Sequence, residues 1–266
     1  MVITESPATQ SEYQLISEWL ESRFYHCIGV TAFLEQTKVV DAQWHLLRLY
    51  DPNRPDVLLG VAVVLAKGTC FWLPEASCFA ELLCPSMMNF QPRRIVTTSV
   101  GRDVLRSVVV PRVHMSREYD QWIMVCTGRF PQANGRMANL SDITRLVEYQ
   151  HQYNEERSVE EVSDWNILIA QEKVAVYEVD SQIVSIVRFG IETDRLVSIG
   201  GTYTFPAYRR QGFAECVVAF VVDRIVSTGR IAHLIVDIDN QAAVALYHQM
   251  GFECVGESYV AYPAYV

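Results

Sequence analysis

Apolar positions in the first half of the chain follow a helical pattern first and strand patterns afterwards. A period near 3.6 predicts one helix from Ser11 to Thr37, carried by Leu15, Ile16, Trp19, Leu20 and Phe24. Two mostly apolar runs, 57–65 and 69–73, flank the turn-like residues 66–68 and predict a hairpin. The remaining expected elements are a short helix over 74–83, a strand over 94–98, a helix over 101–108 and a strand over 121–126. The first half is therefore predicted to be a mixed α/β structure.

The second half alternates helical and extended patterns more densely. Helices are expected from Ile143 onward, over 158–170, over 213–226 and over 240–250, and strands over 174–179, 183–189, 195–204, 231–236 and 252–262. The pattern places Val159, Val162 and Ile167 on the inner side of the helix over 158–170. The valine-rich segment 213–226 is predicted to be a buried helix because of its length and because its polar positions share one helical face.

A segment from Thr127 to Arg136 separates these two patterns. It contains glycine and proline but few apolar residues, which is typical of a boundary. Residues 1–131 contain 12 basic and 13 acidic side chains, whereas residues 132–266 contain 10 and 18. We therefore predict two different domains, residues 1–131 and residues 132–266.

Composition narrows the class of protein. The 266 residues are 50% hydrophobic and 20% charged, which excludes a disordered chain or a coiled coil. The net charge of −9 has the wrong sign for a broad nucleic-acid surface. No apolar stretch approaches the roughly 18 to 20 residues of a membrane span, and Glu5 stands where a secretory signal needs basic residues. We expect a cytoplasmic protein with no nucleic-acid or membrane partner, and its oligomeric state stays open.

The cysteines and isolated histidines carry no recognisable chemistry. The seven cysteines form no C-x-x-C pair and lie mostly in apolar runs, so we expect reduced core thiols and no metal site. The isolated residues His26, His45 and His114 are interpreted as packed or surface side chains.

The most informative segment runs from Tyr203 to Ala214. It joins the end of a strand, a proline, two arginines and a glycine to the start of a long helix. A helix N-terminus offers unpaired N–H groups, and Gly212 lets an anion approach the backbone beside Arg209 and Arg210. The segment therefore predicts a pyrophosphate site, although a capped helix with two surface arginines is the structural alternative. It lacks the glycine patterns of triphosphate and dinucleotide loops.

A second motif follows this segment, and the two motifs together resemble those of a known family. Arg209-x-x-Gly212-x-Ala214 is followed by Asn240-x-x-Ala243-x-x-Leu246-Tyr247-x-x-x-Gly251-Phe252. Together they resemble the GNAT superfamily of acyl-CoA-dependent N-acetyltransferases over roughly residues 135–260. The resemblance implies an α/β (α+β) fold whose mixed, mostly antiparallel sheet is flanked by helices. It also implies acetyl-CoA as co-substrate and no metal.

The resemblance assigns a role to each matching position. The backbone of the loop would hold the pyrophosphate of coenzyme A, which concerns Arg209, Arg210, Gln211, Gly212, Phe213 and Ala214. The main chain of Thr202, Tyr203 and Thr204 would contact pantetheine, where this strand diverges from its neighbour. Asn240 would touch the coenzyme arm, and Tyr247 would lie near the thioester sulfur.

These positions would serve the attack of a neutral amine on an acetyl thioester, with a thiolate leaving. An N–H near Thr202 or Tyr203 can donate to the developing oxyanion. The hydroxyl of Tyr247 can donate a proton to the sulfur, although core packing is the alternative role for this side chain.

The general base has no obvious position in this pattern. Many members of the family place a glutamate on the strand before the loop, but residues 196–203 contain no acid. Deprotonation through water is open, and Glu192, Asp194 and His233 are weak candidates for the base. The favoured interpretation of each of these three side chains is a solvated turn or strand-end residue.

The first half resembles the family only in the order of its elements. It is expected to be a degenerate GNAT-like or other α/β domain, as in some tandem GNAT proteins. We expect an N-acetyltransferase that acts on a primary amine of a small molecule or a peptide. The alternative is a non-catalytic acyl-CoA-binding or regulatory module, whereas a nucleotide hydrolase would need a phosphate loop or metal carboxylates that the sequence lacks.

Overall fold

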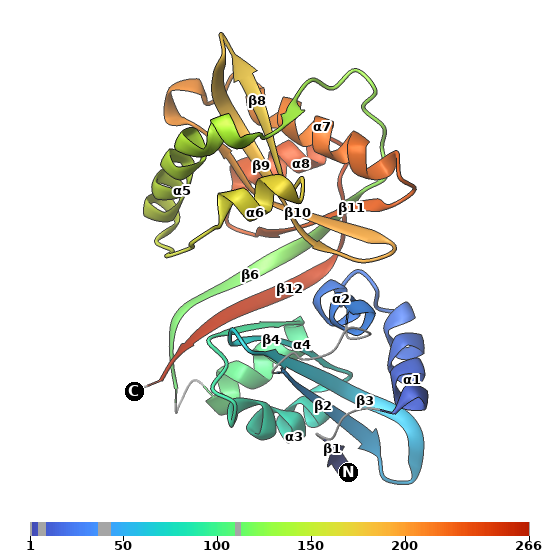
Figure 1. Ribbon diagram of the computed structural model, residues 1–266. Helices are drawn as coiled ribbons and strands as arrows, with labels where there is room; N and C mark the ends of the chain where they lie inside the picture. The colour runs from blue at the N-terminus through green and yellow to red at the C-terminus, as the bar shows by residue number, and fades with distance from the viewer. Residues whose placement is uncertain (1, 5–8, 37–43, 110–112, 266) are drawn as a thin grey trace. The chain divides into compact units, whose positions relative to one another are not determined.

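The structure, a computed structural model, describes residues 2–4, 9–36, 44–109 and 113–265 (Figure 1). The chain divides into two compact units. The first unit comprises Met1–Ile123, Ile235–Gln241 and Cys254–Val266, and the second comprises Met124–Leu234 and Ala242–Glu253. Glu5, which was used to judge a secretory signal, and Thr37, the predicted helix end, lie outside the described residues.

The first unit is built on a sheet with the strand order β1-β2-β3-β4-β5-β12-β6. Its strands are β1 (Val2–Thr4), β2 (Trp44–Asp51), β3 (Arg54–Leu65), β4 (Thr69–Pro74), β5 (Arg94–Thr97), β6 (His114–Cys126) and β12 (Glu253–Ala264). Its helices are α1 (Gln10–Glu21), α2 (Ile28–Gln36), α3 (Ser77–Met88) and α4 (Ser99–Val104), which continues as a π-helical turn, η1 (Leu105–Val109). Two apolar clusters fill its core, one with α3, α4 and η1 and the other with α1 and α2.

The predicted hairpin in the first unit is confirmed, but the predicted long helix is wrong. β3 and β4 pair antiparallel around the turn that contains Gly68. The expected helix from Ser11 to Thr37 is two helices, because α1 ends at Glu21. The guanidinium of Arg23 donates to the carbonyl of Trp19 at 2.8 Å, which is the carbonyl that a continuing helix would pair with the backbone N–H of residue 23.

The second unit has the strand order β11-β10-β9-β8-β7. Its strands are β7 (Arg136–Met137), β8 (Val174–Val179), β9 (Gln182–Glu192), β10 (Leu196–Thr204) and the start of β11 (Ile231–Asp237). Its helices are α5 (Ile143–Arg157), α6 (Trp165–Ala170), α7 (Phe213–Val226) and α8 (Gln241–Gln249), with short 3-10 turns η2 (Leu140–Asp142) and η3 (Pro206–Tyr208). The valine-rich segment is α7, so the prediction of a helix there is confirmed.

Helices cover both faces of the second unit's strands. α5 and α6 pack on one face through a cluster that includes Leu146, Tyr149 and Trp165. The buried valines of α7 lie against β8, β9 and β10. The described strands pair mostly antiparallel, with parallel pairs at β4/β5 and β10/β11. This confirms the predicted mixed, mostly antiparallel sheet flanked by helices.

The predicted helix over 158–170 is wrong in its first half. Ser158 ends α5 in a left-handed conformation with φ of 49°, and α6 begins only after Asp164, whose carboxylate accepts the N–H of Ile167. Val162 is 96% exposed and Ile167 is 53% exposed, so these residues do not face the core as predicted. The segment between α5 and α6 is an acidic loop that exposes Val162.

The proposed domains, residues 1–131 and residues 132–266, stay a prediction. The two units use different parts of the chain, because Ile235–Gln241 and Cys254–Val266 belong to the first unit. Cys27, Cys70, Cys84 and Cys126 are buried and Cys216 is partly buried, but Cys78 and Cys254 are exposed, so they are not core thiols as expected. No helix in the described ranges is long and apolar enough to cross a membrane.

Candidate functional site

A β-bulge in β10 forms the centre of the candidate site. Gly200 pairs with Arg188 of β9 and Tyr203 pairs with Ile186, so β10 has two residues, Gly201 and Thr202, where β9 has one. Gly201 has a φ of +57°, and a Cβ atom there would lie 2.4 Å from Nε of Arg188. The bulge therefore requires glycine for both its conformation and its close approach. It also removes Thr202 from the register with β9.

The register of β10 with its other neighbour, β11, ends before the bulge. β10 and β11 pair in parallel, with Leu196 to Ser198 opposite Ile231 to His233. In the described part of the chain the register stops there, although β10 continues to Thr204. Backbone N–H and C=O groups on an unpaired strand edge can accept an extended ligand as an additional strand. Residues 199–204 of β10 therefore lie outside its register with β11, and the divergence stays a prediction.

The basic loop, residues 209–214, follows β10 and leads into α7. Gly212 is the N-cap residue, with φ of +83° and no side-chain cap on the helix. A Cβ atom at Gly212 would meet nothing within 4 Å, so the space on that side of the N-cap residue is open. Uncapped N–H groups and the helix dipole make this end of α7 suitable for an anion.

The side chains of the basic loop divide into two groups. Arg209 donates from Nε to the carbonyl of Thr204 at 2.9 Å and from Nη2 to both carboxylate oxygens of Glu156 at 2.7 Å. Arg210 and Gln211 are exposed, whereas Phe213 and Ala214 are partly buried. Arg209 therefore fixes the loop to β10 and α5, and Arg210 is the arginine whose charge faces solvent.

Tyr203 and Thr204 use their side chains within the fold. The buried ring of Tyr203 packs against α5, and its hydroxyl donates to Gln152 at 2.9 Å and to Glu156 at 3.0 Å. Burial, followed by the hydrogen bond with Glu156 and its charge, raises the pKa of Tyr203 to about 12. The hydroxyl of Thr204 shares a hydrogen bond with Ser185 at 2.9 Å. Both side chains are therefore used within the fold, and the carbonyl of Tyr203 also accepts the hydroxyl of Ser185 at 3.1 Å.

Tyr247 on α8 reaches the bulge of β10. Its side chain is 6% exposed, and its hydroxyl donates to Oγ1 of Thr202 at 3.1 Å. Burial raises the pKa of Tyr247, so its phenol stays protonated at neutral pH. The structure thus brings together two residues that sequence analysis selected from separate motifs.

Asn240 directly precedes α8, and its backbone N–H donates to the carbonyl of Asp237 at 3.0 Å. It belongs to Ile235–Gln241 of the first unit. Its contact with the coenzyme arm stays a prediction.

The three candidate bases have different environments. Burial alone would raise the pKa of Glu192, but hydrogen bonds from Lys173 and Arg230 lower it. Asp194 lies exposed in the turn between β9 and β10, and His233 is fully buried on β11. Glu192 is therefore committed to two ion pairs, and its lowered pKa makes it a weak base.

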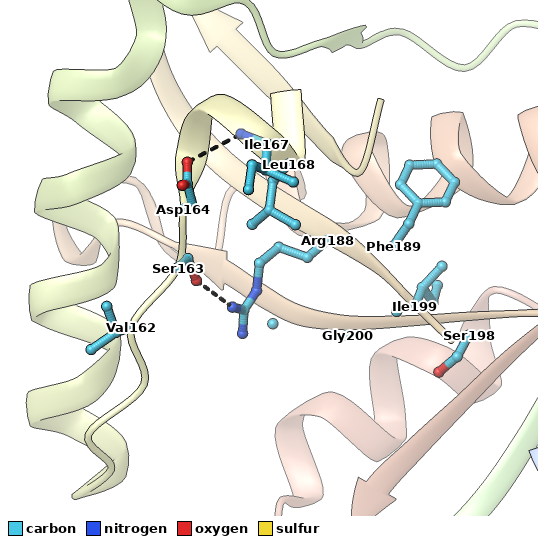
Figure 2. Close-up of a pocket in the computed structure, with 12 residues that line it drawn as sticks. Val162, Ser163, Asp164, Ile167, Leu168, Arg188, Phe189, Ser198, Ile199 and Gly200 are labelled. Atoms are coloured by element: carbon cyan, nitrogen blue, oxygen red, sulfur yellow. Dashed lines mark hydrogen bonds between the residues drawn. The ribbon is translucent and has the colours of Figure 1, made fainter. Parts of the chain in front are cut away.

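A cavity beside the bulge was missed by sequence analysis. It has a volume of about 450 Å³ and is lined by the α5–α6 loop, α6, β9 and the first part of β10 (Figure 2). Arg188 of β9 lines it and donates to Glu161 of the loop at 2.7 Å. The apolar residues Val162 and Ile167 were the available signal, but they were assigned to a buried helix face. Groups of three or more metal-ligating side chains are not found within the described residues.

The first unit contains a similar parallel pair that stays closed. β4 and β5 pair from Thr69 opposite Arg94 to Trp72 opposite Thr97, and Oγ1 of Thr97 donates to the carbonyl of Trp72 at 2.7 Å. The loop after β4 carries Glu75 in place of arginines. In its described residues, the first unit thus lacks both the open strand edge and the basic loop.

Comparisons with known proteins agree with the geometry of the second unit. Residues 140–252 match the model of the acetyltransferase (GNAT) family. No curated protein matches the chain.

Several solved structures share the fold over nearly the whole chain. An acetyltransferase from the GNAT family from Colwellia psychrerythraea is 13% identical, with a TM-score of 0.57 and 100% of both chains covered. A GCN5-related N-acetyltransferase from Sphaerobacter thermophilus is 13% identical, with a TM-score of 0.60, covering 97% of this chain and 94% of that one. A tandem GNAT protein from the clavulanic acid biosynthesis pathway is 9% identical, with a TM-score of 0.54, covering 99% and 98%.

Proposed function

Because residues 140–252 form a GNAT acetyltransferase domain, we propose that the protein transfers an acetyl group from acetyl-CoA to a primary amine. The family and fold support acyl transfer in general. The observation that carries the proposal is the combination of an open β10 edge, an uncapped α7 N-terminus and a buried tyrosine hydroxyl at the bulge. The donor supplies an acyl carbonyl activated as a thioester.

The basic loop and the edge of β10 bind the donor in this proposal. The N–H groups at the start of α7 receive the pyrophosphate, and Arg210 adds a screened positive charge. Gly212 leaves room for the anion, which its open Cβ direction supports. Main-chain groups of Thr202, Tyr203 and Thr204 pair with the amides of the pantetheine arm.

The residues at the bulge assist the transfer itself. The amine nitrogen forms a bond to the acyl carbon while the carbon–sulfur bond breaks, so the amine loses a proton and the thiolate gains one. The N–H of Thr202 lies outside the β9 register and is the proposed donor to the oxyanion. The phenol of Tyr247 gives its proton to the sulfur. With no acid on β10, water accepts the proton from the amine.

Thiol release tests this function. The full chain is incubated with acetyl-CoA and a panel of amines, and free thiol is followed with a thiol-reactive dye. We expect thiol release that depends on an amine, together with an acetylated amine of the correct mass. Gly212→Asp is the comparison variant, because it should strongly reduce the signal by weakening donor binding.

The missing acid on β10 favours a second candidate, a non-catalytic acyl-CoA-binding module. This candidate predicts coenzyme binding by calorimetry without amine-dependent thiol release. Absence of both binding and release would exclude both candidates.

A further inference from the structure

The cavity beside the bulge borders the residues that are proposed to take part in acyl transfer. Gly200 and Gly201 of β10 form part of its lining, and Gly201 is adjacent to Thr202. Val162 of the loop and Ile167 and Leu168 of α6 line the other wall (Figure 2). A ligand in this cavity would therefore contact apolar side chains on one side and the bulge on the other.

Arg188 supplies the cavity with a positive charge, and hydrogen bonds fix the position of its guanidinium. Its side chain is 19% exposed, and its Nη1 lies 3.4 Å from Oγ of Ser163, toward which the guanidinium points in Figure 2. Its position beside Gly201 is close, because a Cβ atom on that glycine would meet Nε and Nη2 at 2.4 and 2.8 Å. The charge is therefore next to the bulge.

The other charges near Arg188 come from the loop. Among the lining residues, Arg188 is the basic one and Asp164 the acidic one, and the carboxylate of Asp164 accepts the N–H of Ile167 as the cap of α6. Glu161, which is 45% exposed, accepts from Nη2 of Arg188 at 2.7 Å. A half-exposed carboxylate on a loop is an anion that another carboxylate can replace.

We propose that the acceptor is an amine that also carries a carboxylate and an apolar substituent, as an apolar α-amino acid does. This inference rests on the proposed function and names its substrate class. The carboxylate displaces Glu161 and binds the guanidinium of Arg188, whose planar donors suit a carboxylate. The apolar substituent contacts Val162 and Ile167. The amine, one carbon from the carboxylate, then lies beside the bulge.

The closing experiment compares three acceptors that differ only at the carboxylate. Leucine, leucinamide and 3-methylbutylamine are titrated into the full chain with coenzyme A by calorimetry, and each is assayed with acetyl-CoA for thiol release. We expect leucine to bind most tightly and to have the lowest KM. Arg188→Gln should weaken leucine by about 10-fold to 100-fold, the range for a hydrogen bond to a charged group, and change leucinamide little.

Glu161→Gln is the second variant, and it changes a half-exposed side chain. Because it removes the anion that competes for Arg188, it should lower the KM of leucine while leaving that of leucinamide unchanged. Arg188→Lys should lie between the native protein and Arg188→Gln, since it keeps the charge but loses the planar pair of donors.

The outcomes separate this inference from the proposed function. Acetylation of 3-methylbutylamine or leucinamide as efficiently as leucine would overturn the inference and leave the acetyltransferase proposal intact. Tight binding of leucine without thiol release from any amine would overturn the proposed function and support Arg188 as a carboxylate site. An equal loss for all three acceptors in Arg188→Gln, with no effect of Glu161→Gln, would show a structural role for Arg188.

Discussion

The hydroxyl of Tyr247 donates a hydrogen bond to Oγ1 of Thr202, which lies in the bulge of β10. This bond joins α8 to the point where β10 leaves the register of β9. It places a protonated phenol next to the main chain that is proposed to bind the acyl group. The proposed mechanism can be tested at this position, because Tyr247→Phe removes the hydroxyl and keeps the ring.

Replacing Tyr247 by Phe should reduce turnover with little change in coenzyme affinity. The ring and its contact with Phe252 remain, and the proton donor is lost. General acid assistance contributes about 100-fold to 10,000-fold, and we expect a loss near the lower end because a thiolate is already a fair leaving group. Steady-state kinetics and calorimetry measure the two quantities. The loss should shrink with an acetyl donor whose thiol leaves more easily, and full turnover in Tyr247→Phe would show that the hydroxyl is structural.

Gly212→Asp should weaken coenzyme A binding by more than about 10-fold, because a side chain and a negative charge would both enter the anion site. Gly229→Asp is a matched control: Gly229 also has a positive φ and open space in its Cβ direction, but it lies after α7. The control should share the backbone strain and keep the affinity for coenzyme A.

Arg210→Ala should weaken coenzyme A binding by only about five-fold, since the exposed charge of Arg210 is screened and the backbone donors remain. Titration calorimetry compares all three variants.

Gly201→Ala should destabilise the protein by about 1–3 kcal/mol and reduce activity. The residue would adopt a positive φ and push against Arg188 and the hydroxyl of Tyr149. Gly200→Ala is the control, because a Cβ atom there meets nothing within 4 Å. Denaturant unfolding gives both free energies. Similar stability of the two variants would contradict the described geometry of the bulge.

Stability should fall as the pH rises from about 10 to about 12, in part because of Tyr203. Below pH 10 the phenol is protonated in the folded and the unfolded chain, so it adds no pH dependence. Between the ordinary value of 10 and the raised pKa of about 12, the unfolded chain loses this proton while the folded protein keeps it. The free energy of unfolding therefore decreases over this range. Unfolding measured against pH should show a shallower decrease in Tyr203→Phe, and an identical slope would show that the phenol is not perturbed.

Calorimetry should find one coenzyme site per chain. In the first unit, the bond from Thr97 to the carbonyl of Trp72 closes the strand pair that is open in the second unit. Thr97→Val removes this bond and should cost about 1 kcal/mol of stability. It should leave coenzyme affinity and stoichiometry unchanged. A second binding event in the native protein would contradict the closed pair.

Much of the second unit could be predicted from the sequence because its elements combine strong local signals. The length of α7 outweighed the strand propensity of its valines, and Gly212 marked the start of this helix. The loop around Val162 was misread, since an apolar rim on a cavity has the same spacing as a buried helix face. Only the left-handed Ser158 and the cap at Asp164 separate the two interpretations, and neither has a unique sequence signal.

The acceptor side of the site could not be predicted for a different reason. Arg188 and Glu161 are 27 positions apart, and their ion pair depends on the bulge at Gly201 and on the path of the loop. Net charge gave no indication of a carboxylate site either, because residues 132–266 contain 18 acidic and 10 basic side chains. A single arginine beside the bulge has more influence on a bound ligand than the distant surface acids, which solvent screens.

The position of β12 in the sheet affects how the first unit folds during translation. It pairs antiparallel with β5, with Tyr259 opposite Thr97 and Ala261 opposite Ile95. A ribosome synthesises β5 long before β12, so the first unit cannot complete its sheet when its own N-terminal segments emerge. One edge of β5 therefore stays unpaired until Ala261 has left the exit tunnel of the ribosome. Folding during translation therefore cannot follow the usual order in which an N-terminal domain finishes first. A truncation that removes β12 would leave the sheet of the first unit incomplete, although the other strands of that sheet had been synthesised earlier.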